Sequence, residues 1–227
     1  MGEKSRARRS FITGLGSAVA VTGLGVVSVA AQAPGSRFQA VRHGDDDWMD
    51  KLPGKHRMVI DGVTANGGGE ALLFANNLFN ANKSAYSLAE QDMAIIVVMR
   101  HFATPFAFTD PIWTKYGKPI SAVIKFTDPK TQAAPTTNLY NSPAYGLTLP
   151  NLGTTIDSLV KRGVQFAICD VAAHFVAGQL AAANLGDAEA IYKEFASNTI
   201  PNSRFVPAGV VAVNRAQERG YTLIYAG

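Results

Sequence analysis

The chain has 227 residues, of which 47% are hydrophobic and 17% charged, and its formal net charge is +4. This length and apolar content predict one globular domain with a core of its own, and they exclude a disordered or collagen-like chain. The single cysteine excludes an internal disulfide framework and a zinc site built on several thiolates.

The first 33 residues have the pattern of an export signal. A basic cluster that includes Arg8 and Arg9 precedes a Gly/Ala/Val-rich apolar stretch, which ends in a small-x-small site at residues 31–33. The Arg8-Arg9 pair followed by Ser-Phe-Ile resembles the twin-arginine (Tat) signal, which implies export to the periplasm as a folded protein. Because a proline follows the small-x-small site directly, cleavage at an earlier alanine and retention as a membrane anchor both stay open.

Most of the net positive charge lies in this segment. Without residues 1–33 the chain has 17 Lys and Arg against 16 Asp and Glu, a net charge of +1. The remaining chain therefore needs no basic face, and we expect no nucleic-acid partner.

The sequence of residues 34–227 predicts a short arm followed by one α/β domain. Residues 34–54 are polar and rich in Gly, Pro and Asp, which is typical of a linker or arm. From residue 55 to 227 apolar runs alternate with helical patterns. We expect strands near residues 56–61, 93–99, 164–169, 204–206 and 221–225, and helices near 70–83, 154–162, 171–183, 188–197 and 210–219. This alternation predicts a three-layer sandwich with a mostly parallel, about five-stranded sheet.

Two segments depart from this alternation. Residues 66–69, Asn-Gly-Gly-Gly, match neither Gly-rich phosphate-binding fingerprint, and they indicate a flexible turn. Residues 102–153 contain seven prolines and eight widely spaced aromatic residues, and only residues 111–116 have a helical pattern. We expect an irregular insertion here, of the kind that often forms a lid or a contact between subunits.

The C-terminal half contains more specific motifs. Gly163-Val-Gln-Phe-Ala-Ile-Cys169 is followed by Phe205-Val-Pro-Ala-Gly-Val-Val211 and then by Ala216-Gln-Glu-Arg-Gly-Tyr-Thr-Leu-Ile224. Together these segments resemble the DsrE/DsrF-like family, closely over residues 154–227 and weakly over residues 56–101. The resemblance implies a flavodoxin-like fold, homotrimers or homohexamers, and a cysteine that carries sulfur as a persulfide. Cys169 occupies the matching position.

Three side chains are candidates for the chemistry. Cys169 would lie at a strand's carboxyl end, just before a helix N-terminus whose amides and dipole favour a thiolate. His101 also ends a strand and could exchange a proton with Cys169 or pair with it. His174, in the first turns of the following helix, is a weaker candidate. The alternatives are a buried structural cysteine and a histidine bonded to a loop. We assign no metal and no cofactor, because these three residues match no known ligand spacing.

The resulting hypothesis is an exported homo-oligomer that binds or transfers sulfur through Cys169. Its partners would be a sulfur-containing small molecule or a redox or sulfur-oxidation protein. The alternative is a non-catalytic scaffold subunit that contacts a ligand or partner through the aromatic side chains of residues 102–153. Any enzymatic activity would be that of a sulfur carrier or transferase, because the sequence has no Gly-x-Ser-x-Gly elbow of a hydrolase.

Overall fold

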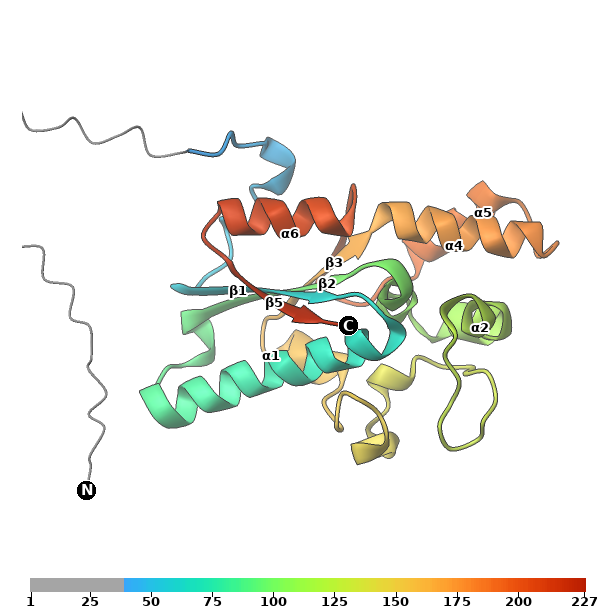
Figure 1. Cartoon of the computed structure of the whole chain (residues 1–227), viewed down its shortest axis with the longest axis horizontal. Helices are drawn as coiled ribbons and strands as arrows, with labels where there is room; N and C mark the ends of the chain where they lie inside the picture. Colours follow the sequence, from blue (N-terminus) through green and yellow to red (C-terminus); the bar gives the residue numbers. More distant parts are fainter. Residues whose placement is uncertain (1–38) are drawn as a thin grey trace, which may run out of the picture. The chain divides into compact units, whose positions relative to one another are not determined.

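Five parallel strands form a single sheet (Figure 1). The computed structural model describes residues 39–227, so the predicted signal, residues 1–33, lies outside the described residues. The strands are β1 (His56–Gly62), β2 (Met93–Met99), β3 (Gln165–Cys169), β4 (Ser203–Val206) and β5 (Thr222–Ala226). Their spatial order is β4-β3-β2-β1-β5, and each neighbouring pair is parallel. The predicted α/β fold with a five-stranded parallel sheet is confirmed.

Helices cover both faces of the sheet. They are α1 (Ala65–Tyr86), α2 (Asp110–Ile124), α3 (Ile156–Lys161), α4 (Asp170–Ala182), α5 (Ala188–Ser197) and α6 (Gly209–Glu218). Helices α1 to α5 bury apolar side chains in one core cluster, whereas α6 contributes to a second cluster on the opposite face. Figure 1 shows α1 and α6 on opposite sides of the sheet. The result is a three-layer sandwich of the flavodoxin-like type.

The connections explain how the helices divide between the faces. Strands β1 to β4 follow one another across the sheet, and right-handed crossovers in one direction place their helices on one face. The chain then returns from β4 at one edge to β5 at the other, and α6 packs across the opposite face on the way. Helices α4 and α6, which follow the neighbouring strands β3 and β4, therefore leave toward opposite faces. Such a switch opens a crevice at the carboxyl ends of the strands.

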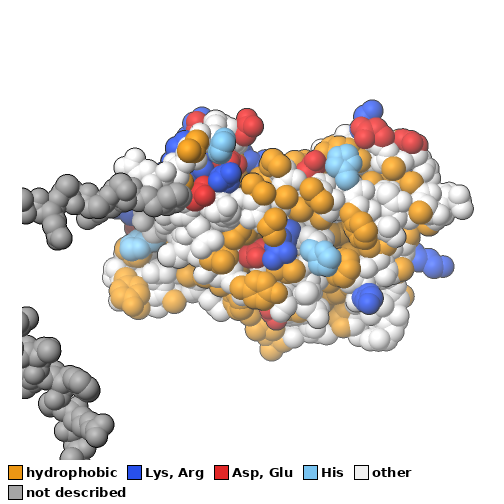
Figure 2. Space-filling view, turned by 45° about the horizontal axis from the view of Figure 1, so that its top comes forward, with side chains coloured by type: hydrophobic (Ala, Val, Ile, Leu, Met, Phe, Trp, Pro, Cys, Tyr) orange, Lys and Arg blue, Asp and Glu red, His pale blue; other side chains and the backbone are white. Residues whose placement is uncertain are grey.

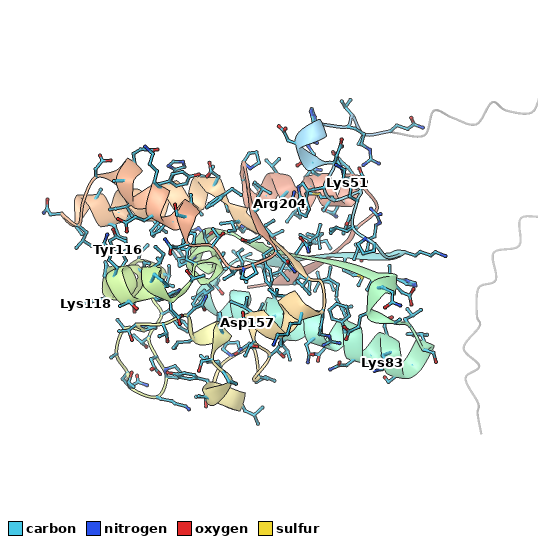
Figure 3. All side chains as sticks on the ribbon, turned by 180° about the vertical axis from the view of Figure 1, so that it is seen from behind. Lys51, Lys83, Tyr116, Lys118, Asp157 and Arg204 are labelled. Carbon is cyan, nitrogen blue, oxygen red and sulfur yellow. The ribbon has the colours of Figure 1, made fainter. Side chains whose placement is uncertain are left out.

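The arm before β1 belongs to the layer formed by α6. Trp48 and Met49 are buried in the second core cluster, and the Tyr221 hydroxyl donates a hydrogen bond of 2.6 Å to the Met49 carbonyl. The Arg204 guanidinium, labelled in Figure 3, lies 4.4 Å from the centre of the Trp48 ring. Residues 39–54, the described part of the predicted arm, therefore complete the cover of this face.

The glycine-rich segment is helical, which corrects the prediction of a flexible turn. Helix α1 begins at Ala65, and the Thr64 side chain caps it by accepting a hydrogen bond of 2.9 Å from the Gly67 amide. A Cβ atom on Gly69 would lie 2.7 Å from the Tyr140 ring, and one on Gly67 would lie 2.5 Å from a backbone oxygen of β5. These glycines let the helix approach its neighbours closely.

The segment of residues 102–153 is also more regular than expected. It contains all of α2 and three 3₁₀ helices, at His101–Ala107, Leu139–Asn141 and Pro143–Thr148. Six of its eight aromatic side chains are buried: Phe106, Phe108, Trp113, Tyr116, Phe126 and Tyr140. This segment therefore supplies much of the core beneath α1 and α4.

The elements after residue 153 agree with the prediction to within about two residues at each end. Strand β2 is buried along its whole length, as predicted for a central parallel strand. In the part of the chain that the structure describes, no helix combines the length and the apolar character needed to cross a membrane.

Candidate functional site

A pocket of about 330 Å³ lies in the crevice at the carboxyl ends of β2, β3 and β4. Apolar side chains gather on this part of the surface, over the starts of α4 and α6 (Figure 2). The pocket is lined by Arg100, His101, Cys169, Val171, Ala172, Phe175, Ala208, Gly209 and Val210. It forms where the topology predicts a ligand site, because the helices after β3 and β4 diverge here.

Cys169 is the last residue of β3 and the residue that precedes the first turn of α4. Its side chain is 7% exposed, and the free thiol lines the pocket. Neither Cys169 nor Ala208, the residue at the same place before α6, caps its helix with a side chain. The first-turn amides of two helices therefore border the pocket without side-chain acceptors, and they favour negative charge there.

Arg100 supplies a fixed cation at the same place. Its Nε and Nη2 atoms donate hydrogen bonds of 2.7 and 2.9 Å to the two carboxylate oxygens of Asp61, the penultimate residue of β1. The hydrogen bond to Asp61 raises the pKa of Arg100 above its usual value, against the effect of burial. Arg100 and Cys169 line the same pocket.

Gly209 allows this arrangement. A Cβ atom at this position would overlap the Cβ of Arg100, so only glycine lets the start of α6 lie against the Arg100 side chain. Sequence reasoning missed both Arg100 and Asp61 as site residues. The sequence did contain a signal for this pair: one apolar strand ends near Asp61 and the next ends before Arg100, two residues of opposite charge. Neighbouring parallel strands bring such ends together.

His101 follows the carboxyl end of β2 and lines the same pocket as Cys169. Its backbone has a φ of 52°, in the left-handed region that few residues other than glycine adopt. The exposed imidazole stacks on the Phe102 ring, with 4.0 Å between the ring centres. This position allows His101 to exchange protons with a ligand in the pocket.

His174 does not join the pocket. Its imidazole stacks on the Tyr192 ring, with 3.7 Å between the centres, and its Nε2 lies 3.7 Å from a carboxylate oxygen of Asp170. The Tyr192 hydroxyl donates a hydrogen bond of 2.6 Å to Asp170. Burial and this hydrogen bond raise the pKa of Tyr192 to about 12. His174 therefore belongs to a contact between α4 and α5.

The structure brings two of the three predicted residues into one pocket. Within residues 39–227 no group of three or more His, Cys, Asp or Glu side chains could hold a metal ion. The chemistry available here is that of a shielded sulfur nucleophile beside a fixed cation and an imidazole. No protein-family model matches the chain, and no curated protein matches it.

Proposed function

We propose that this protein is a sulfur carrier that holds a sulfur atom on Cys169 as a persulfide. The observation that carries the proposal is the position of the only cysteine: its thiol lines a small, largely apolar pocket next to the Asp61-bound Arg100. A thiolate and a persulfide anion are both favoured by a nearby cation and by helix N-termini.

The transfer step balances without an external oxidant. The Cys169 thiolate attacks the terminal sulfur of a donor R–S–SH, the donor S–S bond breaks, and R–S⁻ leaves. The leaving sulfur takes up the proton of the donor, and Cys169 keeps the transferred atom as Cys–S–S⁻. His101, exposed at the pocket, can pass this proton. A thiol of a second molecule then removes the sulfur by the same exchange.

The resemblance to the DsrE/DsrF-like family, the Tat-type signal and a periplasmic location are part of this proposal. Among residues 39–227, β5 pairs with β1 alone, and its Leu223 is 42% and its Tyr225 61% exposed. This supports a homo-oligomer, because an uncovered apolar strand edge tends to pair. A monomer mass in light scattering would exclude the oligomer. If the wild-type protein stays in the cytoplasm, and a variant with Arg8 and Arg9 both replaced by Lys does so to the same extent, Tat export is excluded.

The scaffold alternative has less support. It needs the aromatic side chains of residues 102–153 at the surface, whereas most of them are in the core. Deleting this segment would remove core packing, so a loss of function in such a deletion would not distinguish the two hypotheses.

Intact-mass analysis tests the sulfur-carrier proposal. The purified protein is incubated with a polysulfide donor, and we expect an added mass of one sulfur atom that dithiothreitol removes. The matched variant Cys169→Ser should remain unmodified. An unmodified wild-type protein, or the same adduct on Cys169→Ser, overturns the proposal.

A further inference from the structure

The walls of the Cys169 pocket are more apolar than the transfer of inorganic sulfur requires. Val171 and Phe175 come from α4, and Val210 comes from α6. Phe175 is 49% exposed and Val210 58% exposed, on helices that lie on opposite faces of the sheet. Large side chains left uncovered on both sides of a crevice favour a ligand that fills the space between them.

The size of the pocket limits that ligand. About 330 Å³ is at the lower end of the range of about 300–1,000 Å³ for small-molecule pockets. A pocket of this size holds a ligand of several non-hydrogen atoms. Sulfide or hydrodisulfide, with one or two such atoms, would leave water against the apolar walls.

The charge of the pocket argues in the same direction. Of the residues that the structure describes, Arg100 is the one Lys or Arg in the lining, and Asp61 binds it through both carboxylate oxygens. The pair has no net charge, which suits a neutral or singly charged ligand better than a doubly charged sulfur oxyanion. The polar side chains of the lining are those of Cys169, Arg100 and His101, and its other side chains are apolar.

We infer that the sulfur donor of this site is organic: a small persulfide R–S–SH in which R is an apolar group of about six or seven carbons. The inference rests on the proposed sulfur-carrier function and names its donor class. The group R contacts Phe175 and Val210 while the terminal sulfur meets the Cys169 thiolate. Transfer follows the balanced exchange given above, and R–SH leaves the pocket.

Donor selectivity measured by intact mass at short reaction times tests the inference. Benzyl persulfide is compared with inorganic hydrodisulfide, and each rate is divided by the rate for free cysteine with the same donor. We expect wild type to prefer benzyl persulfide by about tenfold or more. The double variant Phe175→Ser, Val210→Ser should lose about tenfold with benzyl persulfide and less than about twofold with hydrodisulfide. The control Val211→Ser alters an exposed neighbour that does not line the pocket, and it should keep the selectivity.

Binding of benzyl methyl sulfide, which cannot transfer sulfur, gives a second measurement by NMR. It should bind wild type and Val211→Ser but not the double variant. Equal normalised rates for the two donors overturn the inference and leave the carrier function standing. Absence of any adduct on wild type with either donor overturns the carrier function. The binding of benzyl methyl sulfide then still tests whether the pocket takes an apolar ligand. Failure of the thioether to bind wild type, for example because a second copy of the chain covers the pocket, overturns the inference.

Discussion

The two ends of the sheet each carry a pocket with an arginine bound to a carboxylate, yet the pairs differ in surroundings. At the carboxyl end Arg100 holds Asp61, whose side chain is 8% exposed. At the amino end a pocket of about 420 Å³ contains Arg162, which holds Glu90, 44% exposed, at 2.7 Å. The volumes are similar, so size alone does not separate a reactive site from a structural one.

The direction of the neighbouring helices makes the difference. Arg162 follows the last residue of α3, where helix carbonyls favour a cation, and it also donates to Asn76 and Asn80 of α1. It therefore ties three elements together. Arg100 lies where α6 and α4 begin, so its guanidinium and the uncapped first-turn amides favour negative charge in the space that the Cys169 sulfur also lines. The parallel sheet therefore separates a structural end from the end that we propose to be reactive.

The largest expected difference between the ends is in stability. Asp61→Asn removes the charge from a largely buried pair and should lower the free energy of unfolding by about 2 kcal/mol, less than the 3–5 kcal/mol of a fully buried pair because Arg100 is partly exposed. Glu90→Gln, in the pair whose carboxylate is exposed, should lower the free energy of unfolding by less than about 1 kcal/mol. Urea unfolding of both variants measures this. Equal losses would show that burial does not distinguish the pairs.

The next largest effect concerns reactivity. Arg100→Met should slow alkylation of Cys169 by iodoacetamide by about tenfold at neutral pH, which corresponds to about 1.4 kcal/mol, because the attacking sulfur loses a cation that lines the same pocket. Arg162→Met, at the other end, should change the rate by less than about twofold. The double variant Asp61→Asn, Arg100→Met should stay slow. Recovery of the wild-type rate there would assign the effect to the bare Asp61 carboxylate and not to the lost cation.

The fold and part of the site could be predicted because they depend on local patterns. Apolar runs and helical periodicity gave the strands and helices of the C-terminal half, and the ends of parallel strands meet at one edge, which brought Cys169 and His101 together. His174 was misplaced because of helix phase. Residues four apart share a helix face, so Val171 and Phe175 face the pocket, whereas His174 lies on the face of Asp170.

Other features depend on contacts between distant residues and have no local signal. The glycines at 67–69 have poor helix propensity, yet they lie in α1, and positions 67 and 69 require glycine because the end of β5 and Tyr140 lie too close for a Cβ atom. The Asp61–Arg100 pair joins residues 39 positions apart and depends on the register of β1 and β2. Gly209 is required only because α6 starts against Arg100.

The smallest expected effect compares a tyrosine near each end under alkaline conditions. The pKa of both Tyr192 and Tyr221 is raised to about 12, in each case chiefly by burial, so the fold favours the neutral phenols. Their stabilising contribution is complete below pH 10 and is lost as the pH rises toward 12, where the folded protein also ionises. Tyr192→Phe should lower stability by about 1 kcal/mol near pH 8, because Asp170 loses a hydrogen bond.

This deficit should shrink between about pH 10 and 12, since the variant lacks a phenol to ionise. Tyr221→Phe, which removes the hydrogen bond to the Met49 carbonyl at the amino end, should show the same trend. Urea unfolding at several pH values measures both. Because Asp170 directly follows Cys169, only the Tyr192 variant should also alter alkylation of Cys169, by about twofold or less. A deficit independent of pH would show that neither phenol is held neutral by the fold, and an equal change in alkylation for both variants would remove the distinction between the two ends.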